Sequence, residues 1–279
     1  MRVLVTGAKG QLGFDIIKEL AARGIDHKGV DMGDFDITDK VATMEGIAEY
    51  KPTAVIHCAA YTAVDKAEDE PELCRKINEG GTRNIAQACK EINAKMIYIS
   101  TDYVFPGEGT HFHKPDDQTA PMSVYGKTKL AGELAVKAEL EEYFIVRISW
   151  VFGKNGNNFV ETMLRLGKER DSLNVVNDQI GSPTYTADLA PLLCDMAASD
   201  KYGVYHATNE GVCSWAEFAA EIFKVAGLGT KVNGIPSSEY PTKAVRPLNS
   251  RLDKGCLGDV GFDRLRNWQS ALADYVGEK

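Results

Sequence analysis

The chain has 279 residues, of which 44% are hydrophobic and 26% are charged, and its formal net charge is −8. A chain of this length forms one large or two small globular domains and needs no disulfide or metal to bury a core. Its acidic balance argues against general binding of nucleic acid, because phosphate backbones attract a cationic excess. No run approaches the roughly 18 consecutive apolar residues of a membrane helix. We expect no nucleic-acid partner and no membrane partner.

The cysteines and the N-terminus indicate the compartment. The six cysteines include no Cys-x-x-Cys pair, so neither a zinc cluster nor a disulfide framework is expected. Residues 1–7 lead directly into a folded pattern and lack the charged and apolar runs of a secretory leader. We expect a cytoplasmic protein.

The first half of the chain alternates short apolar strands with amphipathic helices. In chain order, the pattern predicts a strand at 2–6, a helix at 11–23, a strand at 27–31, a helix at 39–50, a strand at 54–60, a helix at 72–93, a strand at 96–100, a helix at 124–141 and a strand at 143–148. Strands that are apolar on both faces are typical of a parallel sheet covered by helices. The predicted fold class is therefore α/β, a Rossmann-type doubly wound parallel sheet.

The rhythm changes after about residue 150. Helices are predicted at 158–170 and 215–226, residues 177–186 are expected to be irregular, and 237–252, which contain two prolines, are expected to form a loop. We expect a sheet domain over residues 1–150, completed by part of 175–210. A smaller C-terminal lobe over residues 151–279 is expected to be interleaved with it.

Glycines recur at positions 7, 10 and 13, between the first predicted strand and the first helix. Glycines in such a turn allow a sharp bend, a close approach of pyrophosphate to the backbone and close packing of the helix on the sheet. The helix N-terminus also attracts phosphate. The motif predicts dinucleotide binding, with Asp31 at the end of the second strand placed to accept the adenosine ribose hydroxyls. A simple turn residue is the alternative interpretation of Asp31.

A second motif joins Tyr125 and Lys129, which share one face of a predicted helix because they are four residues apart. A tyrosine hydroxyl has a pKa of about 10, and a neighbouring lysine ammonium and an oxidised nicotinamide ring are expected to lower that pKa towards neutrality. A shift of ~3 units takes about 4 kcal/mol. Thr101, at the end of a buried strand, supplies a hydroxyl that can orient a carbonyl oxygen. Together with the glycine motif, this pair predicts the active site of a reductase.

Several sequence blocks extend this interpretation: 10–13 (GQLG), 63–68 (AVDKAE), 100–105 (STDYVF), 125–133 (YGKTKLAGE), 147–152 (RISWVF), 177–179 (NDQ), 181–184 (GSPT) and 246–250 (RPLNS). With these blocks the chain resembles the dTDP-4-dehydrorhamnose reductases, which are extended short-chain dehydrogenases/reductases. The resemblance covers residues 1–275. It implies that NADH or NADPH reduces the 4-keto group of dTDP-4-dehydro-β-L-rhamnose to give dTDP-L-rhamnose, a precursor of cell-surface polysaccharide.

The resemblance also implies a role for individual residues. Tyr125 would be the proton donor, Lys129 its electrostatic partner and a ribose ligand, and Thr101 the third catalytic group. The cofactor would be held by Gly7, Gly10, Gln11, Leu12, Gly13, Asp31, Asp36, Ile37, Ala59, Ala60, Tyr61, Thr62, Tyr125 and Lys129. The nucleotide sugar would contact Thr101, Asp102, Trp150, Asn177 and Arg246. For Arg246, a surface arginine in a loop is the alternative interpretation.

Cofactor choice and metal binding are less constrained. Asp31 would repel the 2′-phosphate of NADPH, and no arginine follows it closely, so NADH is expected to be at least usable. Members of the family are associated with Mg²⁺, but no residue here can be assigned as its ligand. His111 and His113 lie in a loop rich in glycine and proline, where solvated side chains are the expected state. No metal site is predicted.

Two other functions share the scaffold. One is a non-catalytic regulatory subunit resembling the β subunit of methionine adenosyltransferase, against which the intact Thr101, Tyr125 and Lys129 argue. The other is a nucleotide-sugar epimerase or dehydratase, and a dehydratase would require a glutamate where Tyr103 follows Asp102. The expected partner is a small nucleotide sugar, and the chain is expected to be a monomer or a homodimer.

Overall fold

The computed structural model describes residues 1–278. Its centre is a six-stranded sheet with the strand order β10-β5-β4-β3-β1-β2, in which every neighbouring pair is parallel. The strands are β1 (Arg2–Thr6), β2 (Asp26–Val30), β3 (Ala54–His57), β4 (Lys95–Thr101), β5 (Tyr143–Ile148) and β10 (Gly203–His206). This sheet confirms the predicted Rossmann-type α/β fold.

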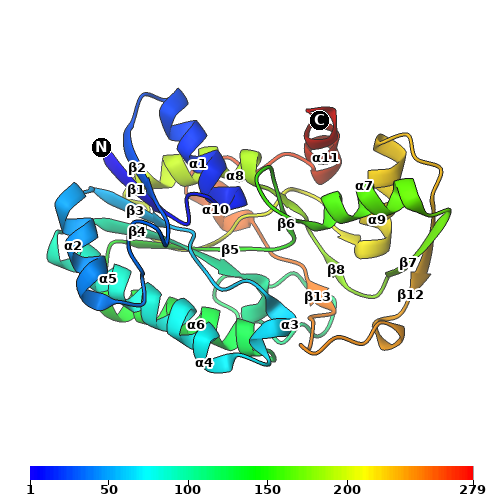
Figure 1. Ribbon diagram of the computed structural model, residues 1–279, viewed down its shortest axis with the longest axis horizontal. Coiled ribbons are helices and arrows are strands. Elements are labelled where there is room, and N and C mark those ends of the chain that lie inside the picture. The colour runs from blue at the N-terminus through cyan, green and yellow to red at the C-terminus, as the bar shows by residue number, and fades with distance from the viewer. Residues whose placement is uncertain (279) are drawn as a thin grey trace.

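Helices cover both faces of the sheet (Figure 1). One face carries α1 (Gln11–Ala22) and α8 (Thr186–Ala197), and the other carries α2 (Lys40–Tyr50), α5 (Thr82–Glu91) and α6 (Val124–Glu139). Successive strand residues point to opposite faces. Val3 and Val5 therefore pack with α1 and α8, whereas Leu4 packs with the second group. Burial on both faces explains why the strands show no apolar–polar alternation.

A smaller lobe lies to the right of the sheet in Figure 1. It contains β6 (Val151–Phe152), α7 (Phe159–Glu169), β7 (Ser172–Val176), β8 (Ile180–Gly181), β9 (Thr184–Tyr185), β11 (Cys213–Ser214), α9 (Trp215–Val225), β12 (Lys231–Ile235), a 3-10 turn η3 (Ser237–Glu239), β13 (Asn249–Ser250) and α11 (Trp268–Gly277). The short helix α10 (Gly255–Asp259) lies between β13 and α11 in sequence. The small lobe has a hydrophobic core of its own, which includes Phe152, Phe218 and Trp268.

Four predicted elements differ from the structure. The predicted strand 54–60 ends at His57, where the chain leaves the sheet to pass the glycine turn. The predicted helix 72–93 is α4 (Pro71–Arg75), a π-helical segment η1 (Lys76–Gly81) and α5 in succession. Region 177–186 holds the short strands β8 and β9, and loop 237–252 contains β13. The sequence pattern did not predict β7, β12, α8 or α11, and it gave no bounds for β10, which lies within the range 175–210 expected to complete the sheet. Helix α8 contains Pro191, which usually argues against a helix interior.

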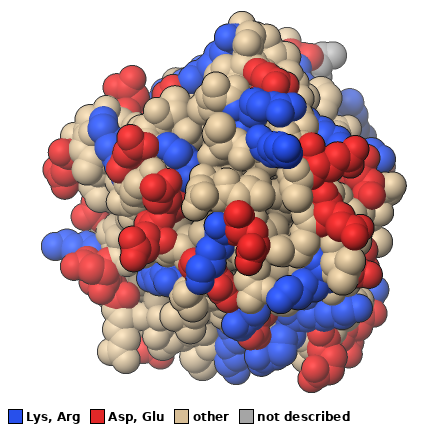
Figure 2. Space-filling view, turned by 90° about the vertical axis from the view of Figure 1, so that its left-hand side faces the viewer, with Lys and Arg blue, Asp and Glu red and all other residues tan. Residues whose placement is uncertain are grey.

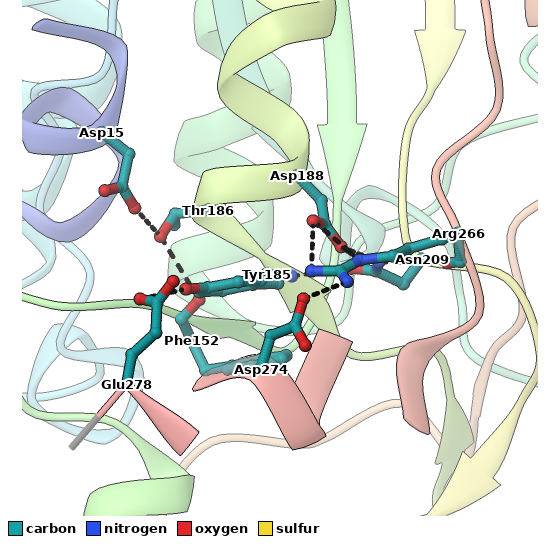
Figure 3. Close-up of polar contacts among 9 residues, drawn as sticks. All are labelled: Asp15, Phe152, Tyr185, Thr186, Asp188, Asn209, Arg266, Asp274 and Glu278. Atoms are coloured by element: carbon teal, nitrogen blue, oxygen red, sulfur yellow. Dashed lines mark hydrogen bonds and ion pairs between the residues drawn. The ribbon is translucent and has the colours of Figure 1, made fainter. Parts of the chain in front are cut away.

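Polar contacts tie the C-terminal segments back to the sheet domain (Figure 3). Thr186, which begins α8, donates its hydroxyl to Asp15 of α1 at 2.5 Å, and burial raises the pKa of Asp15. Arg266 pairs with Asp188 of α8 at 2.9 Å and with Asp274 of α11. Because α8 also packs on the sheet, these contacts hold the end of the chain against the domain in which it began.

The surface carries charges of both signs. On the face shown in Figure 2, acidic and basic side chains are interspersed. Ion pairs along a helical run contribute to the mixture of surface charges, as Glu79 pairs with both Arg75 and Arg83. Within residues 1–278, no helix is both long and apolar enough to span a bilayer.

Candidate active site

The glycine turn joins β1 to α1 in a conformation that side chains would obstruct. Gly7 has a φ of +66°, and a Cβ added to it would lie 2.8 Å from the Ala59 amide nitrogen. A Cβ on Gly13 would lie 2.2 Å from the Gly7 carbonyl oxygen. Gly10 caps α1 without a side chain, so the first amides of the helix stay accessible. This turn fits the pyrophosphate of a dinucleotide.

Asp31 lies beside the same turn. Its carboxylate accepts hydrogen bonds from the backbone amides of Lys9, at 3.1 Å, and Met32, at 3.0 Å. Asp36 is exposed and accepts from the Thr38 amide at 2.8 Å. Asp31 directly follows the end of β2, and Asp36 lies five residues further along the chain.

The other predicted cofactor residues follow β3. Ala59, Ala60 and Tyr61 are partly exposed beyond the end of the strand, and Thr62 is exposed. Ile37 is held nearby, because Asn84 donates to its carbonyl at 2.9 Å. In an open α/β sheet, ligands bind at the carboxyl ends of the strands, and these residues lie at that edge.

Asn78 is a residue that the sequence analysis missed. It is buried in the π-helical segment η1, accepts the Tyr61 amide at 2.8 Å and donates to the Tyr61 carbonyl at 3.1 Å. It also donates to the Thr128 hydroxyl at 3.1 Å. Asn78 thus joins the predicted cofactor wall to helix α6. The adjacent pair Gly80 and Gly81 was the available signal, since two glycines interrupt a regular helix.

The structure brings Thr101, Asp102 and Tyr125 together. Thr101 ends β4 and donates its hydroxyl to the Asp102 carboxylate at 3.0 Å, and a hydrogen bond also joins Thr101 to Tyr125. Tyr125 lies in the first turn of α6, which begins with the Ser123 side chain accepting the Gly126 amide at 3.1 Å. These hydroxyls can converge on one carbonyl oxygen.

Lys129 lies one turn after Tyr125, buried inside the protein. Its ammonium donates to the Ile99 carbonyl at 2.6 Å and lies 4.2 Å from the centre of the Tyr98 ring. Burial lowers the pKa of Lys129 to about 7. Burial also raises the pKa of Tyr125 above its ordinary value, and the hydrogen bond from Thr101 opposes that rise, whereas the sequence analysis expects the pKa of this hydroxyl to be lowered.

A buried ion pair lies behind Lys129. Glu133, one further turn along α6, receives two hydrogen bonds of 2.8 Å from the Arg147 guanidinium and one of 2.6 Å from Ser100. Both charged side chains are almost fully buried. The carboxylate of Glu133 raises the pKa of Lys129 against the effect of burial. The sequence analysis did not assign Glu133 or Arg147, although an arginine within an otherwise apolar strand was an available signal.

Asp102 connects the site to the small lobe. Ser250, in β13, donates its hydroxyl to Asp102 at 2.5 Å. Burial raises the pKa of Asp102 to about 6, and the hydroxyls of Ser250 and Thr101 oppose that shift. This hydrogen bond ties β13 to the residue that follows β4.

The remaining predicted substrate residues occupy different places. Trp150 follows β5 with a φ of +50° and stacks on Trp215 at 3.7 Å between ring centres. Arg246 pairs with Asp65 at 2.6 Å and also contacts Tyr103.

The ring of Tyr103 in turn meets Tyr125 edge-on at 5.5 Å. This contact places Arg246 at the rim of the site. Asn177 is exposed just after β7. Its backbone amide donates to the backbone carbonyl of Ile235 in β12 at 2.9 Å. Its hydrogen bond therefore lies within the small lobe.

Comparison with known proteins identifies the family. The model of the RmlD substrate binding domain matches residues 1–279. A dTDP-4-dehydrorhamnose reductase of Streptomyces griseus is 42% identical over 98% of this chain and 92% of its own length.

Two solved structures agree over the whole length of the chain. The dTDP-4-dehydrorhamnose reductase of Clostridium acetobutylicum has a TM-score of 0.97 and 44% identity, covering 100% of this chain and 99% of its own. The enzyme of Bacillus anthracis, solved in complex with NADP, gives the same TM-score, identity and coverage. The chain therefore belongs to the dTDP-4-dehydrorhamnose reductase family.

Proposed function

We propose that this chain is an NAD(P)H-dependent oxidoreductase that reduces the 4-keto group of dTDP-4-dehydro-β-L-rhamnose to give dTDP-L-rhamnose. The observation that carries the proposal is the convergence of Thr101, Tyr125 and Lys129 at the carboxyl end of β4. The full-length similarity to dTDP-4-dehydrorhamnose reductases supports the choice of substrate.

The glycine turn and the carboxyl ends of β1 and β3 would hold the cofactor. Bound NADH or NADPH would supply a hydride to the C4 carbon of the sugar. The amides at the start of α1 favour the pyrophosphate. Asp31 accepts hydrogen bonds and therefore suits the adenosine ribose hydroxyls, and Lys129 suits the hydroxyls of the other ribose.

The hydroxyls of Thr101 and Tyr125 would complete the reaction at the oxygen. As the C4 carbonyl is reduced, negative charge develops on its oxygen, and preorganised donors in a buried site stabilise that charge strongly. The Thr101 hydroxyl, which donates its one proton to Asp102 in this structure, would turn to donate it to the oxygen, and Tyr125 would transfer its own proton to that oxygen. The raised pKa of Tyr125 keeps the phenol protonated. The ammonium of Lys129 stabilises the phenolate that remains.

Asp102 and the small lobe would orient the sugar. Asp102 is fixed by two hydroxyls, from Thr101 and Ser250, which leaves its carboxylate in one orientation. Trp150 would offer an apolar face to the sugar, and Arg246 and Asn177 would lie near the diphosphate, since a guanidinium suits phosphate oxygens.

We further propose a division of labour between the two parts of the chain. Residues 1–150, with β10 adding a strand to the sheet, would bind the cofactor. Residues 151–279 would mainly bind the nucleotide sugar. The return of α8 and β10 to the sheet domain supports an interleaved arrangement of the two parts rather than separate modules.

The test is direct. The purified chain is incubated with dTDP-4-dehydro-β-L-rhamnose and either NADH or NADPH, and both nicotinamide absorbance and the product mass are followed. A product two mass units heavier, with equal oxidation of cofactor, supports the proposal. The Thr101→Val variant, which removes one hydroxyl, should be much slower. No oxidation of either cofactor would contradict a catalytic role and favour a regulatory one.

A further inference from the structure

Three potential metal ligands meet on the loop that follows β4. One nitrogen each from His111 and His113 and one oxygen of Asp117 all lie within 4.8 Å of one another. The sequence analysis considered only the two histidines as possible ligands and did not include Asp117, which lies four residues after His113. The structure folds the loop so that the carboxylate returns to face both rings.

We propose that His111, His113 and Asp117 form a binding site for a divalent transition-metal ion, preferably Zn²⁺. Two imidazoles and one carboxylate are a donor set typical of zinc. Mg²⁺ and Ca²⁺ prefer ligand sets made of oxygen alone. This site is separate from the residues proposed for catalysis.

The separations of the ligand atoms support this assignment. The Asp117 carboxylate oxygen lies 3.8 Å from Nε2 of His111 and 3.9 Å from Nδ1 of His113. Both distances are too long for direct hydrogen bonds. Tetrahedral zinc with bonds of about 2.0–2.1 Å places its ligand atoms about 3.4 Å apart. A contraction of about half an ångström along these two separations would therefore bring the carboxylate oxygen to the spacing of a tetrahedral site.

Two of the three ligands are already held in place. The His113 ring is buried and stacks on Phe105 at 4.3 Å with an interplanar angle of 4°. Its Nε2 lies against Asn249, and the ring has a hydrogen bond to the backbone of that residue. A backbone contact on one ring nitrogen leaves the other free to bind metal.

The second ligand held in place is Asp117, which lies in a tight turn. Its carboxylate accepts the Lys114 amide at 2.9 Å, and its own amide donates to the Lys114 carbonyl at 3.1 Å. His111 is the adjustable ligand, since its side chain is 62% exposed. A bound ion would therefore need to reposition mainly one free side chain.

The surrounding contacts indicate what the ion would do. The His113 backbone exchanges hydrogen bonds with Arg251 and Asp253, at 2.9 and 2.8 Å. Asn249 donates to the His111 carbonyl at 2.9 Å. The next residue, Ser250, holds Asp102. An ion would fasten this loop to the strand that closes the substrate site, and we expect it to stabilise the fold rather than take part in the chemistry.

The experiment measures Zn²⁺ binding by calorimetry on the full chain, stripped of metal and free of any histidine tag. We expect one ion per chain. His111→Ala and Asp117→Asn should each weaken binding by at least about tenfold, whereas His27→Ala, which alters a histidine outside the cluster, should leave it unchanged. Asp117→Asn keeps the shape of the side chain, and His111 is exposed, so both variants should fold.

Thermal unfolding provides a second readout. Saturating Zn²⁺ should raise the melting temperature of the wild type and of His27→Ala, because a ligand of the folded state stabilises it. At the same Zn²⁺ concentration the rise should be clearly smaller in His111→Ala and Asp117→Asn, and Mg²⁺ should cause no rise through this site. The proposal is overturned if the wild type binds no Zn²⁺, or if these two variants bind it as tightly as the wild type.

Discussion

Replacing Glu133 with glutamine tests the buried ion pair behind Lys129. The change keeps the shape of the side chain but leaves the Arg147 guanidinium, 3% exposed, without its counter-charge. Breaking a buried pair by removing one partner typically costs about 3–5 kcal/mol. We expect the Glu133→Gln variant to lose that much free energy of unfolding, measured by urea titration with unchanged m-value.

Two matched variants make the reasoning refutable. Glu141→Gln is the same chemical change at an exposed position near the end of α6 and should cost less than about 0.5 kcal/mol. The double variant Glu133→Gln/Arg147→Met removes both charges and should recover much of the lost stability. The reasoning is wrong if Glu133→Gln costs no more than Glu141→Gln.

The same variant also predicts a change in pH dependence. The Glu133 carboxylate raises the pKa of Lys129, which burial lowers to about 7. Removing the carboxylate should lower that pKa further, so Lys129 loses its proton at a lower pH. If the protonated lysine is the active form, the alkaline limb of the pH profile should move towards lower pH. An alkaline limb that does not move would contradict the claim that the Glu133 carboxylate sets the pKa of Lys129.

Two further predictions concern cofactor and substrate binding. Asp31→Ser should raise kcat/KM for NADPH relative to NADH, because a carboxylate about 4 Å from a 2′-phosphate costs about 4 kcal/mol at an effective dielectric near 20, before screening by salt. A wild-type kcat/KM tenfold higher with NADPH than with NADH would contradict the repulsion. Trp150→Ala and Arg246→Ala should raise KM for the nucleotide sugar with NADH affinity near that of the wild type. An unchanged sugar KM in steady-state assays would remove both residues from the substrate site.

Much of the fold and of the site could be predicted from local sequence patterns. The glycine turn, the buried strands and the spacing from Tyr125 to Lys129 are each contained in a short stretch of chain. The sheet domain consequently has the predicted class, and Thr101 lies beside Tyr125.

Contacts between distant segments could not be predicted in the same way. Asn78 contacts Tyr61 from a π-helical segment, and a search for the ordinary helical period does not reveal such a segment. Ser250 contacts Asp102, although the two are 148 residues apart in sequence. Arg147 of β5 pairs with Glu133 of α6. The sequence analysis proposed no helix over Thr186–Ala197, although α8 packs against the sheet domain there. Tertiary packing decided each of these features.

The most direct test of the proposed chemistry is single-turnover oxidation of bound NADH by the 4-keto sugar in the Tyr125→Phe variant. The change removes one hydroxyl and keeps the ring. Tyr143→Phe serves as the control, because Tyr143 begins β5 and so lies at the amino end of that strand, away from the site. General acid catalysis contributes about 10²–10⁴-fold, so the rate should fall by that factor with cofactor affinity nearly intact, while the control stays near wild type. If Tyr125→Phe keeps more than about a tenth of the wild-type rate, Tyr125 is not the proton donor.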